Sequence, residues 1–349
     1  MQSPELESLY QPLLAKLKNV IPVAEIRYKA ELAVEINRLK KQRNAVILGH
    51  NYMEPALYLS VPDFKGDSLE LSRQAAKTDK EIIVFCGVRF MAETAKILNP
   101  TKTVLIPSPK AGCSLAESIT AEDVRQLKAM YPGVPVVTYI NTYAEVKAEA
   151  DICCTSGNAV RVVQSLKSER VIFLPDQYLA GNVARESGKK IIFPIKTAAG
   201  LRQPTANLEY AMIGWDGKCE VHDKFTVEDI ENIRKQFPDV VILAHPECRP
   251  EVTAAADFSG STSAMIRYVQ QTQAPHYLLL TECSMADNIA AENPNKEMLR
   301  LCSVRCPHMN EITLEDTLKS LQLTQYEVQV EETIRHRALR ALQRMLEIG

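Results

Sequence analysis

Three cysteines stand at one fixed distance from a predicted helix start. Cys113, Cys219 and Cys306 each precede by seven residues a Thr that is followed, three residues later, by Asp. This Thr–Asp spacing is typical of a helix N-terminus, where the hydroxyl accepts from a free backbone N–H group. The recurrence predicts three copies of one unit, whose thiols can meet if the copies pack around a common axis.

Three converging thiolates are suited to a metal centre. They can bind three irons of a [4Fe–4S] cluster and leave the fourth iron open as a Lewis acid for a substrate hydroxyl or carboxylate. The absence of a C-x2-C pair disfavours a zinc knuckle, although spacing alone does not separate iron from zinc. We interpret the cysteines without a recurring offset as buried structural thiols: Cys86, Cys153, Cys154, Cys248, Cys283 and Cys302.

Polar side chains follow three predicted strands in the same register. The strands are residues 45–48, 135–138 and 240–243, and the polar residues after them are His50, Asn51 and Tyr52, then Tyr139 and Asn141, then His245 and Glu247. Ligands of open α/β sheets bind beyond the carboxyl ends of the strands. A single strand-end His is more often structural, but the recurrence favours a shared functional site.

Hydroxyl groups recur at three further positions. Ser68, Ser156 and Thr262 each lie five residues after an Asp and open a predicted helix. One such residue alone would be interpreted as an N-cap. Three helix starts that face one centre can bind anions, because free N–H groups and the helix dipole favour carboxylate or phosphate. We therefore predict a site for a small, multiply anionic substrate.

Short apolar runs alternate with amphipathic helical segments along the whole chain, which favours parallel strands covered on both faces. The order of elements recurs at roughly 90–105 residues, a domain-scale repeat. We predict an α/β fold of three homologous three-layer αβα domains, with parallel sheets around a pseudo-threefold axis and the site at the centre. The expected boundaries are 1–112 with an N-terminal leader, 113–218, 219–306, and 307–349, whose helices should pack on the first repeat and complete it.

Composition restricts the partners and the compartment. The chain is 46% apolar and 24% charged with a net charge of −2, so charge gives no case for nucleic acid or an anionic membrane. The first 18 residues contain no apolar signal region, and no apolar run is long enough to span a bilayer. Nine cysteines without an export signal favour a reducing cytoplasm. We expect a cytoplasmic protein with no nucleic-acid or membrane partner.

An ordered set of motifs resembles the quinolinate synthase family, the iron–sulfur enzymes of de novo NAD biosynthesis. The resemblance runs from about residue 31 to residue 315 and is specific as a set, although each motif alone is weak. The motifs lie at 49–52 (GHNY), 66–68 (GDS), 86–93 (CGVRFMAE), 111–113 (AGC), 139–141 (YIN), 155–158 (TSGN), 175–177 (PDQ), 215–222 (WDGKCEVH), 245–248 (HPEC), 260–262 (GST) and 306–307 (CP).

The resemblance implies a reaction and a set of roles. Iminoaspartate condenses with dihydroxyacetone phosphate, phosphate leaves, and two dehydrations with ring closure give quinolinate. Cys113, Cys219 and Cys306 would bind the [4Fe–4S] cluster. Glu247 would act as general acid/base, Tyr52 would assist isomerisation of the triose intermediate, and His50 would belong to the same catalytic group. The residues implied in substrate binding are His50, Ser68, Tyr139, Asn141, Ser156, His245, Glu247 and Thr262.

Two departures from the family pattern and two other functions stay open. Cys302 lies four residues before Cys306, where some relatives have C-x2-C-x2-C, so a disulfide switch is not expected, and residues 57–62 are unlike the usual family segment. Another iron–sulfur hydro-lyase would share the open iron but not the motifs. A non-catalytic metal or redox sensor would explain the thiols but not the polar strand ends. A transient contact with the oxidase that produces iminoaspartate is a further partner that the resemblance allows.

Overall fold

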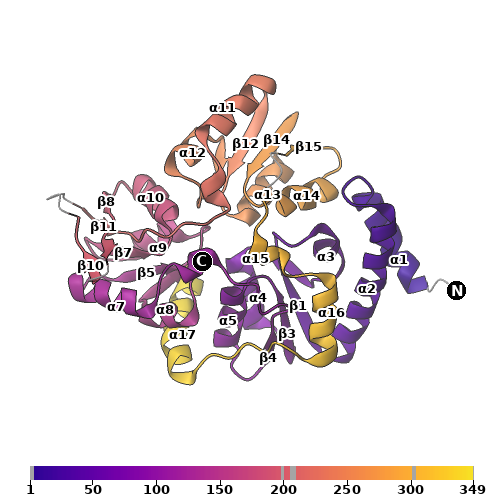
Figure 1. Cartoon of the computed structure of the whole chain (residues 1–349), viewed down its shortest axis with the longest axis horizontal. Coiled ribbons are helices and arrows are strands. Elements are labelled where there is room, and N and C mark those ends of the chain that lie inside the picture. Colours follow the sequence, from indigo (N-terminus) through magenta and orange to yellow (C-terminus); the bar gives the residue numbers. More distant parts are fainter. Residues whose placement is uncertain (1–3, 198–199, 205–209, 301–303, 349) are drawn as a thin grey trace.

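Three parallel sheets form the framework of the protein. The computed structural model describes residues 4–197, 200–204, 210–300 and 304–348. The strand orders are β2-β1-β3-β4, β6-β5-β7-β11-β8 and β13-β12-β14-β15. Figure 1 shows the sheets in three lobes that meet near the middle of the molecule, with helices on both faces of the sheets. The α/β class with parallel sheets in an αβα arrangement is therefore confirmed.

The first lobe begins with two helices that pack on each other and bury Leu13, Leu17 and Ile26. Its central strand is buried at every position, as expected for a parallel strand covered on both faces. The elements are α1 (Pro4–Leu17), α2 (Val23–Gln42), β1 (Ala45–His50), α3 (Pro55–Ser60), β2 (Phe64–Gly66), α4 (Ser68–Lys77), β3 (Ile82–Cys86), α5 (Arg89–Leu98) and β4 (Thr103–Leu105).

The second lobe contains the same four-strand order and one additional strand. Its elements are α6 (Ser114–Glu117), α7 (Ala121–Met130), β5 (Val136–Tyr139), α8 (Ala144–Glu149), β6 (Ile152–Cys154), α9 (Ala159–Ser165), β7 (Val171–Leu174), α10 (Gln177–Glu186), β8 (Ile191–Ile192), β9 (Ile195–Thr197), β10 (Gly200–Arg202) and β11 (Met212–Ile213). The antiparallel pair β9–β10 and the short strand β11 were not predicted. They lack a long apolar run, and β9 has no buried position.

The third lobe and the C-terminal segment complete the chain. Their elements are η1 (His222–Lys224), α11 (Val227–Gln236), β12 (Val240–Ala244), α12 (Pro250–Ala255), β13 (Phe258–Ser259), α13 (Thr262–Gln271), β14 (His276–Leu280), α14 (Cys283–Glu292), β15 (Glu297–Leu299), α15 (Pro307–Asn310), α16 (Leu314–Leu323) and α17 (Glu332–Ile348). None of the helices in these described ranges, or earlier in the described chain, combines the length and the hydropathy of a membrane span.

One aspartate in each lobe joins the first strand to the segment that leads to the second. Asp63, Asp151 and Asp257 each accept, at 2.8 Å, the N–H of a residue in that first strand: Ile47, Val136 and Ile242. The aspartate's own N–H returns a bond of 2.9 Å to the carbonyl of the same residue. The same two-bond link therefore sets the path toward β2, β6 and β13.

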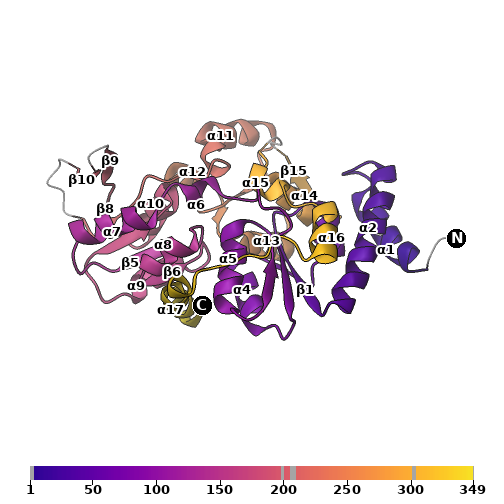
Figure 2. The same cartoon turned by 60° about the horizontal axis from the view of Figure 1, so that its bottom comes forward.

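The two C-terminal helices pack on different lobes. α16 lies against α2 and β3 of the first lobe. The expectation that residues 307–349 pack on the first repeat is wrong for α17, which lies mainly against α8 and β6 of the second lobe. The chain between them crosses the first lobe beside β4, where Val328 N–H donates to Val104, and this path carries α17 past that sheet (Figures 1 and 2).

Contacts with the second lobe explain where α17 lies. Its buried face includes Ala338, Ala341, Leu342 and Met345. At the polar edge, Arg337 pairs with Glu149 of α8 at 2.8 Å, and Arg344 donates to the Asp151 carbonyl. An amphipathic helix needs only one surface to bury its apolar stripe, and these partners lie on the second lobe.

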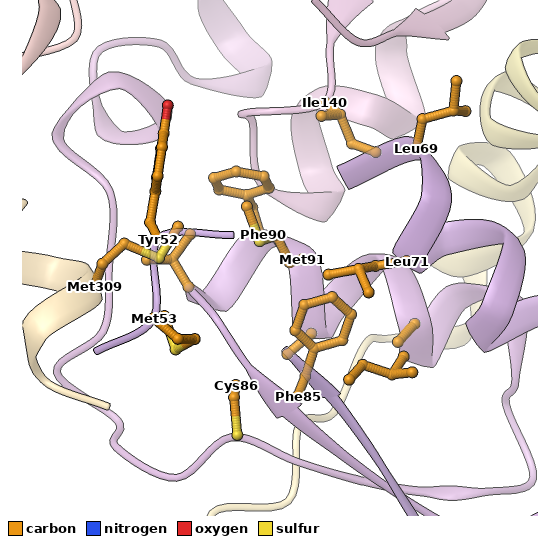
Figure 3. Close-up of a cluster of buried hydrophobic side chains, with 14 of the residues drawn as sticks. Tyr52, Met53, Leu69, Leu71, Phe85, Cys86, Phe90, Met91, Ile140 and Met309 are labelled. Carbon is orange, nitrogen blue, oxygen red and sulfur yellow. The ribbon is translucent and has the colours of Figure 1, made fainter. Parts of the chain in front are cut away.

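Apolar side chains from separate segments of the chain pack together around the base of Tyr52. Figure 3 shows Tyr52 beside Met53 and Met309, with Phe90 close by and the Tyr52 hydroxyl directed away from this apolar cluster. Met309 comes from α15, so the cluster links the C-terminal segment to the first lobe. Tyr52 thus has an apolar base and presents only its polar end toward the centre.

We expect Asp151→Ala to lower the free energy of unfolding by about 2 kcal/mol, because the buried Val136 N–H loses its charged acceptor. Urea denaturation at neutral pH measures this change. Asp79→Ala is the matched control, since the Asp79 side chain is 91% exposed. Equal stability of the Asp151 and Asp79 variants would contradict the role assigned to the link.

Candidate active site

One cavity of about 70 Å³ lies where the three lobes meet. This volume is large enough for several water molecules or part of a small ligand. Twelve of its lining residues are the predicted site residues, so the structure brings the whole predicted set together: His50, Tyr52, Ser68, Cys113, Tyr139, Asn141, Ser156, Cys219, His245, Glu247, Thr262 and Cys306.

The three cysteines have the same backbone environment. Each sulfur faces the N–H groups of the second and third residues after it, which are Leu115 and Ala116, Val221 and His222, and His308 and Met309. Cys113 and Cys306 are also the residues that precede the first turns of α6 and α15. Backbone N–H groups stabilise a thiolate, so each loop is shaped to hold an anionic sulfur.

Burial opposes ionisation of these thiols when no cation is near. It raises the pKa of Cys113 to about 12 and that of Cys306 to about 11, and it raises the pKa of Cys219 well above its usual value. A bound cation reverses this balance, because thiolate ligands are stabilised by the metal charge. Three thiols with preformed N–H donors are therefore a donor set that fits a cationic metal centre.

A second group of donors shares one of these cysteines. Ligand atoms of Cys219, His222 and Glu247 lie within 4.8 Å of one another. His222 Nδ1 is 3.2 Å from the Cys219 sulfur and 2.8 Å from Glu247 Oε2. A single nitrogen faces both neighbours, so a metal bound there would compete with the His222–Glu247 pair.

His50 and His245 occupy equivalent places after β1 and β12. In each case the backbone N–H two residues later, of Tyr52 or Glu247, donates to the histidine Nδ1. Nδ1 is therefore the acceptor nitrogen, and Nε2 carries the proton of the neutral ring. Burial lowers the pKa of His50 to about 4 and that of His245 to about 3, where nearby His222 also contributes. Both rings are neutral donors at physiological pH.

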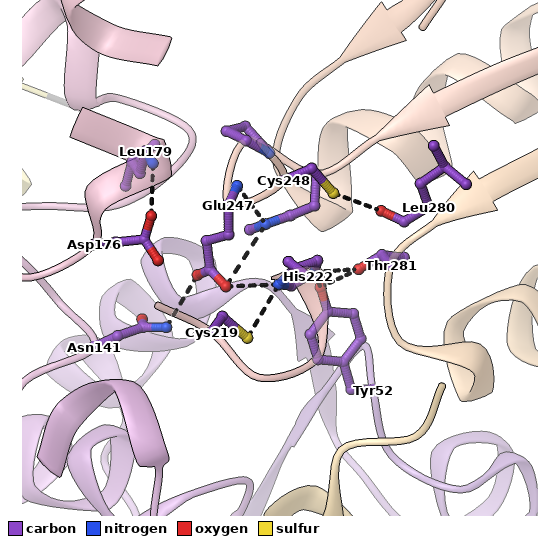
Figure 4. Close-up of polar contacts among 12 residues, drawn as sticks. Tyr52, Asn141, Asp176, Leu179, Cys219, His222, Glu247, Cys248, Leu280 and Thr281 are labelled. Atoms are coloured by element: carbon purple, nitrogen blue, oxygen red, sulfur yellow. Dashed lines mark hydrogen bonds and ion pairs between the residues drawn. The ribbon is translucent and has the colours of Figure 1, made fainter. Parts of the chain in front are cut away.

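Glu247 is a buried carboxylate held in its charged form. Burial alone would raise its pKa, but the facing His222 and further donors hold the pKa at about 2. Oε1 accepts from the Tyr139 hydroxyl at 2.5 Å and from Asn141 Nδ2 at 3.2 Å, and both donors belong to the second lobe. Figure 4 shows Glu247 between Asn141 of the second lobe and His222 of the third lobe.

A chain of hydrogen bonds connects Glu247 to Tyr52. His222 Nδ1 faces Glu247 at 2.8 Å, and His222 Nε2 is 2.9 Å from Thr281 Oγ1. Thr281 Oγ1 is in turn 2.5 Å from the Tyr52 hydroxyl (Figure 4). All contacts are satisfied if Tyr52 donates to Thr281, Thr281 to Nε2, and Nδ1–H to Glu247. This arrangement can move a proton between the carboxylate and the phenol.

The hydroxyl-bearing helix starts face the same cavity. The cap of α4 is Asp67, whose side chain accepts from the Leu69 and Glu70 N–H groups, and the cap of α13 is Ser261. Ser68 and Thr262 are therefore not the N-caps that a single case would suggest. Thr262 Oγ1 accepts from Asn51 Nδ2 at 2.9 Å, which joins the first lobe to the third.

Four polar residues of the centre had no predicted role: Asp176, His222, Thr281 and Glu282. The N–H of Cys219 helps to lower the pKa of Asp176, and the N–H of Cys306 does the same for Glu282, so these carboxylates lie against two cysteine loops. Burial raises the pKa of Glu282 to about 7. Asp176 and Glu282 follow β7 and β14 in equivalent places, so the strand-end pattern extended to the next strand of each unit identifies them.

The remaining cysteines were interpreted as structural. Cys86, Cys153, Cys154, Cys248 and Cys283 are all buried. Cys302 lies outside the described residues. The segment 57–62, unlike its counterpart in the family, forms the end of α3, and Leu57 and Tyr58 are buried there.

Comparison with known proteins adds independent information. The profile of the quinolinate synthetase A protein (NadA) family matches residues 34–347. Quinolinate synthase 2 of Mesorhizobium japonicum is 51% identical over 336 residues, covering 96% of this chain and 97% of the relative. Quinolinate synthase of Caulobacter vibrioides is 49% identical over 350 residues, covering 99% and 89%. The relative of that name from Xylella fastidiosa is 50% identical over 325 residues, covering 93% and 89%.

We expect His245→Gln to make the protein less sensitive to acid. The folded-state pKa of His245 is lowered from 6.5 to about 3, so below pH 6.5 the unfolded chain binds a proton that the native state does not. Between about pH 7.5 and pH 5.5 this residue should cost roughly 1.4 kcal/mol of stability, and the variant should lose that much less. Urea denaturation at the two pH values measures the difference. His336→Gln on α17, where the side chain is 64% exposed, is the control, and equal pH dependence of wild type and H245Q would refute the assignment.

Proposed function

Because the chain belongs to the quinolinate synthase family, we propose that it forms quinolinate from iminoaspartate and dihydroxyacetone phosphate. The observation that carries this proposal is the cavity shared by three thiols, two neutral histidines and one ionised glutamate, which come from all three lobes. The reaction releases one phosphate and two waters, and its atoms balance without an external oxidant or reductant. The site therefore needs anion binding, proton transfer and help for leaving hydroxyl groups.

The cofactor that fits the site is a [4Fe–4S] cluster held by Cys113, Cys219 and Cys306. The support is the common geometry of these thiols, each with two backbone N–H groups at the sulfur, and their common cavity. When bound, the cluster supplies a Lewis-acidic iron without a protein ligand, which assists the departure of substrate hydroxyl groups. Asp176 and Glu282 would hold two of the cysteine loops in place through the N–H groups of Cys219 and Cys306.

The hydrogen-bond donors around the cavity bind the substrates. The Nε2–H groups of His50 and His245 can donate to carboxylate oxygens, because their Nδ1 atoms already accept from backbone. The hydroxyls of Ser68, Ser156 and Thr262 line the cavity and can donate to phosphate or carboxylate oxygens. Tyr139 and Asn141 complete the substrate-binding set and orient Glu247.

Glu247 and Tyr52 transfer protons to and from the substrate. Glu247 is ionised and therefore starts as a base, at Oε1 or Oε2, for a substrate C–H or N–H proton. The chain through His222 and Thr281 can carry that proton to or from the Tyr52 hydroxyl, where it serves the isomerisation of the triose-derived part. His50 lies beside Tyr52, with ring centroids 4.7 Å apart, and keeps that end of the cavity polar.

We also propose that the chain is a triplicated unit around a pseudo-threefold axis that passes near the cysteines. The units are 1–112, 113–218 and 219–306, with 307–349 as the C-terminal segment. Support comes from the common strand order, the aspartate link and the capped helices that begin after Thr120, Thr226 and Thr313. The thiols of Cys86, Cys153, Cys154 and Cys248 are not in disulfides, which agrees with the reducing cytoplasm that we propose as the compartment.

We expect Cys113→Ala to remove the cluster and Cys86→Ser to leave it in place. Cys113 lines the cavity, whereas Cys86 is buried against Thr317, 3.7 Å from its hydroxyl. Iron and acid-labile sulfide per chain, measured after anaerobic purification, separate the two variants. Iron retained by C113A, or lost from C86S, would show that the thiols are wrongly divided.

We expect anaerobically purified protein to be brown and to form quinolinate from the two substrates. We expect the Glu247→Gln variant to retain its iron but to have a kcat lower by about 10²–10⁴-fold. Glutamine keeps the shape of the side chain but cannot accept a proton as a carboxylate does. Liquid chromatography of quinolinate against time, with iron analysis of each sample, measures both effects. Brown protein that only dehydrates hydroxy acids would indicate a hydro-lyase, and normal turnover by E247Q would remove Glu247 from the mechanism.

A further inference from the structure

A buried lysine of the second lobe has no role in the mechanism described above. Lys147 lies on α8, and its side chain is among the largest that are fully buried in the molecule. Transfer of an ammonium group out of water costs free energy unless other groups offset the loss of hydration. The protein therefore retains a buried positive charge at this position at a cost to its stability.

The fold of the lobe does not require a lysine at this position. Lys147 stands four residues before Asp151, the aspartate that links the first strand of the lobe to the next segment. At the same offset from the linking aspartate, the other two lobes have Leu59 on α3 and Thr253 on α12. An aliphatic or a hydroxyl side chain is thus accepted at the equivalent place, so the charge in the second lobe has another reason.

The Lys147 ammonium group lies between a backbone carbonyl and an aromatic ring of the central cavity. Nζ donates to the Thr142 carbonyl and lies 5.6 Å from the centroid of the Phe90 ring. A cation at this distance from an aromatic face is attracted by the electrons of the ring. Phe90 (Figure 3) lines the central cavity together with Cys113. Lys147 therefore contacts a residue of the cavity wall.

The start of the same helix packs beside the Cys113 loop. Tyr143, the residue before α8, donates from its hydroxyl to Glu117 of α6 at 3.2 Å. The Arg89 guanidinium lies over the Tyr143 ring, 5.0 Å from its centroid, and the Arg89 N–H donates to the Ala111 carbonyl at 2.7 Å. These contacts join α8 and the start of α5 to the loop that carries Cys113.

Charge connects Lys147 with this cysteine. Burial lowers the pKa of Lys147 to about 8, and the neighbouring groups that act in the opposite direction are Cys153, Glu93 and Cys113. Burial raises the pKa of Cys153 to about 12, so this thiol is neutral at physiological pH. Glu93 shares its charge with Arg89, whose Nε donates to it at 2.9 Å. Cys113 becomes an anion when it binds a metal, because metal ligation requires the thiolate.

We propose that Lys147 supplies a positive charge that balances the thiolate ligands of the cluster on the side of Cys113. Three thiolates bring negative charge into a buried centre, and a fixed cation nearby stabilises them. The reduction potential of an iron–sulfur cluster depends on the charges around it, so the lysine also favours the reduced form. The inference rests on the cluster assigned under the proposed function and adds a residue that touches neither substrate nor iron.

The midpoint potential of the cluster tests this role. Anaerobic redox titration with detection of the reduced cluster by electron paramagnetic resonance gives that potential without any turnover. In Lys147→Met the reduction equilibrium constant should fall by about tenfold, which is about 59 mV to more negative potential for one electron. Lys147→Leu, which copies Leu59 of the first lobe, should give the same shift, whereas Lys147→Arg should keep the wild-type potential.

Lys128→Met is the matched control. Lys128 is exposed on α7 of the same lobe, and its Nζ donates to the Glu149 carbonyl of α8 at 3.1 Å. This variant also loses one positive charge and one contact with α8, but the charge that it loses is in water and should not change the potential.

Every other outcome has a stated meaning. Equal potentials in wild type, K147M and K147L, or an equal shift in K128M, would overturn the inference. Failure of K147M and K147L to fold, measured by urea denaturation, would also overturn it, because the charge would then serve the fold. Loss of the cluster from folded K147M and K147L, but not from K147R, would support it. Wild-type protein without iron would overturn the proposed cofactor as well, whereas equal potentials in iron-containing proteins would overturn this inference alone.

Discussion

The charge of Glu247 is the constraint on which the centre of this protein depends. A carboxylate that is 3% exposed is stable only if donors surround it, and the donors here come from two different lobes. Tyr139 and Asn141 of the second lobe donate to Glu247 Oε1, while His222 of the third lobe faces Oε2. Separation of the second lobe from the third would remove both donors to Oε1, so the contacts of the ionised glutamate favour the assembled cavity.

The three lobes have similar local structure after their first strands but different functional side chains there. The strand-end pairs are His50 and Tyr52, Tyr139 and Asn141, and His245 and Glu247. The positions are equivalent, and in two lobes the same backbone contact fixes the histidine tautomer. The different residues at these equivalent positions therefore place neutral donors, a phenol and a base around one cavity. The cysteine loops, in contrast, keep both their residue type and their N–H geometry in every lobe.

Sequence periodicity predicted the helices and strands themselves more accurately than the surfaces against which they pack. The first strand of each lobe begins within one residue of its predicted start, because buried parallel strands are continuous apolar runs with a clear signal. The pair β9–β10 was missed because it has no buried position and lies outside the three parallel sheets. The predicted packing partner of α17 was wrong, because an amphipathic stripe predicts that a helix buries one face but does not identify the surface that covers it.

The sequence by itself determined the spacing of Cys113, Cys219 and Cys306, the polar strand ends and the family to which the chain belongs, since these are properties of residue order. Only the tertiary structure decided that His222 and Thr281 connect Glu247 to Tyr52, and that Asp176 and Glu282 lie against the cysteine loops. These contacts join residues far apart in the chain. Their existence depends on how the lobes pack, and no local pattern encodes that packing.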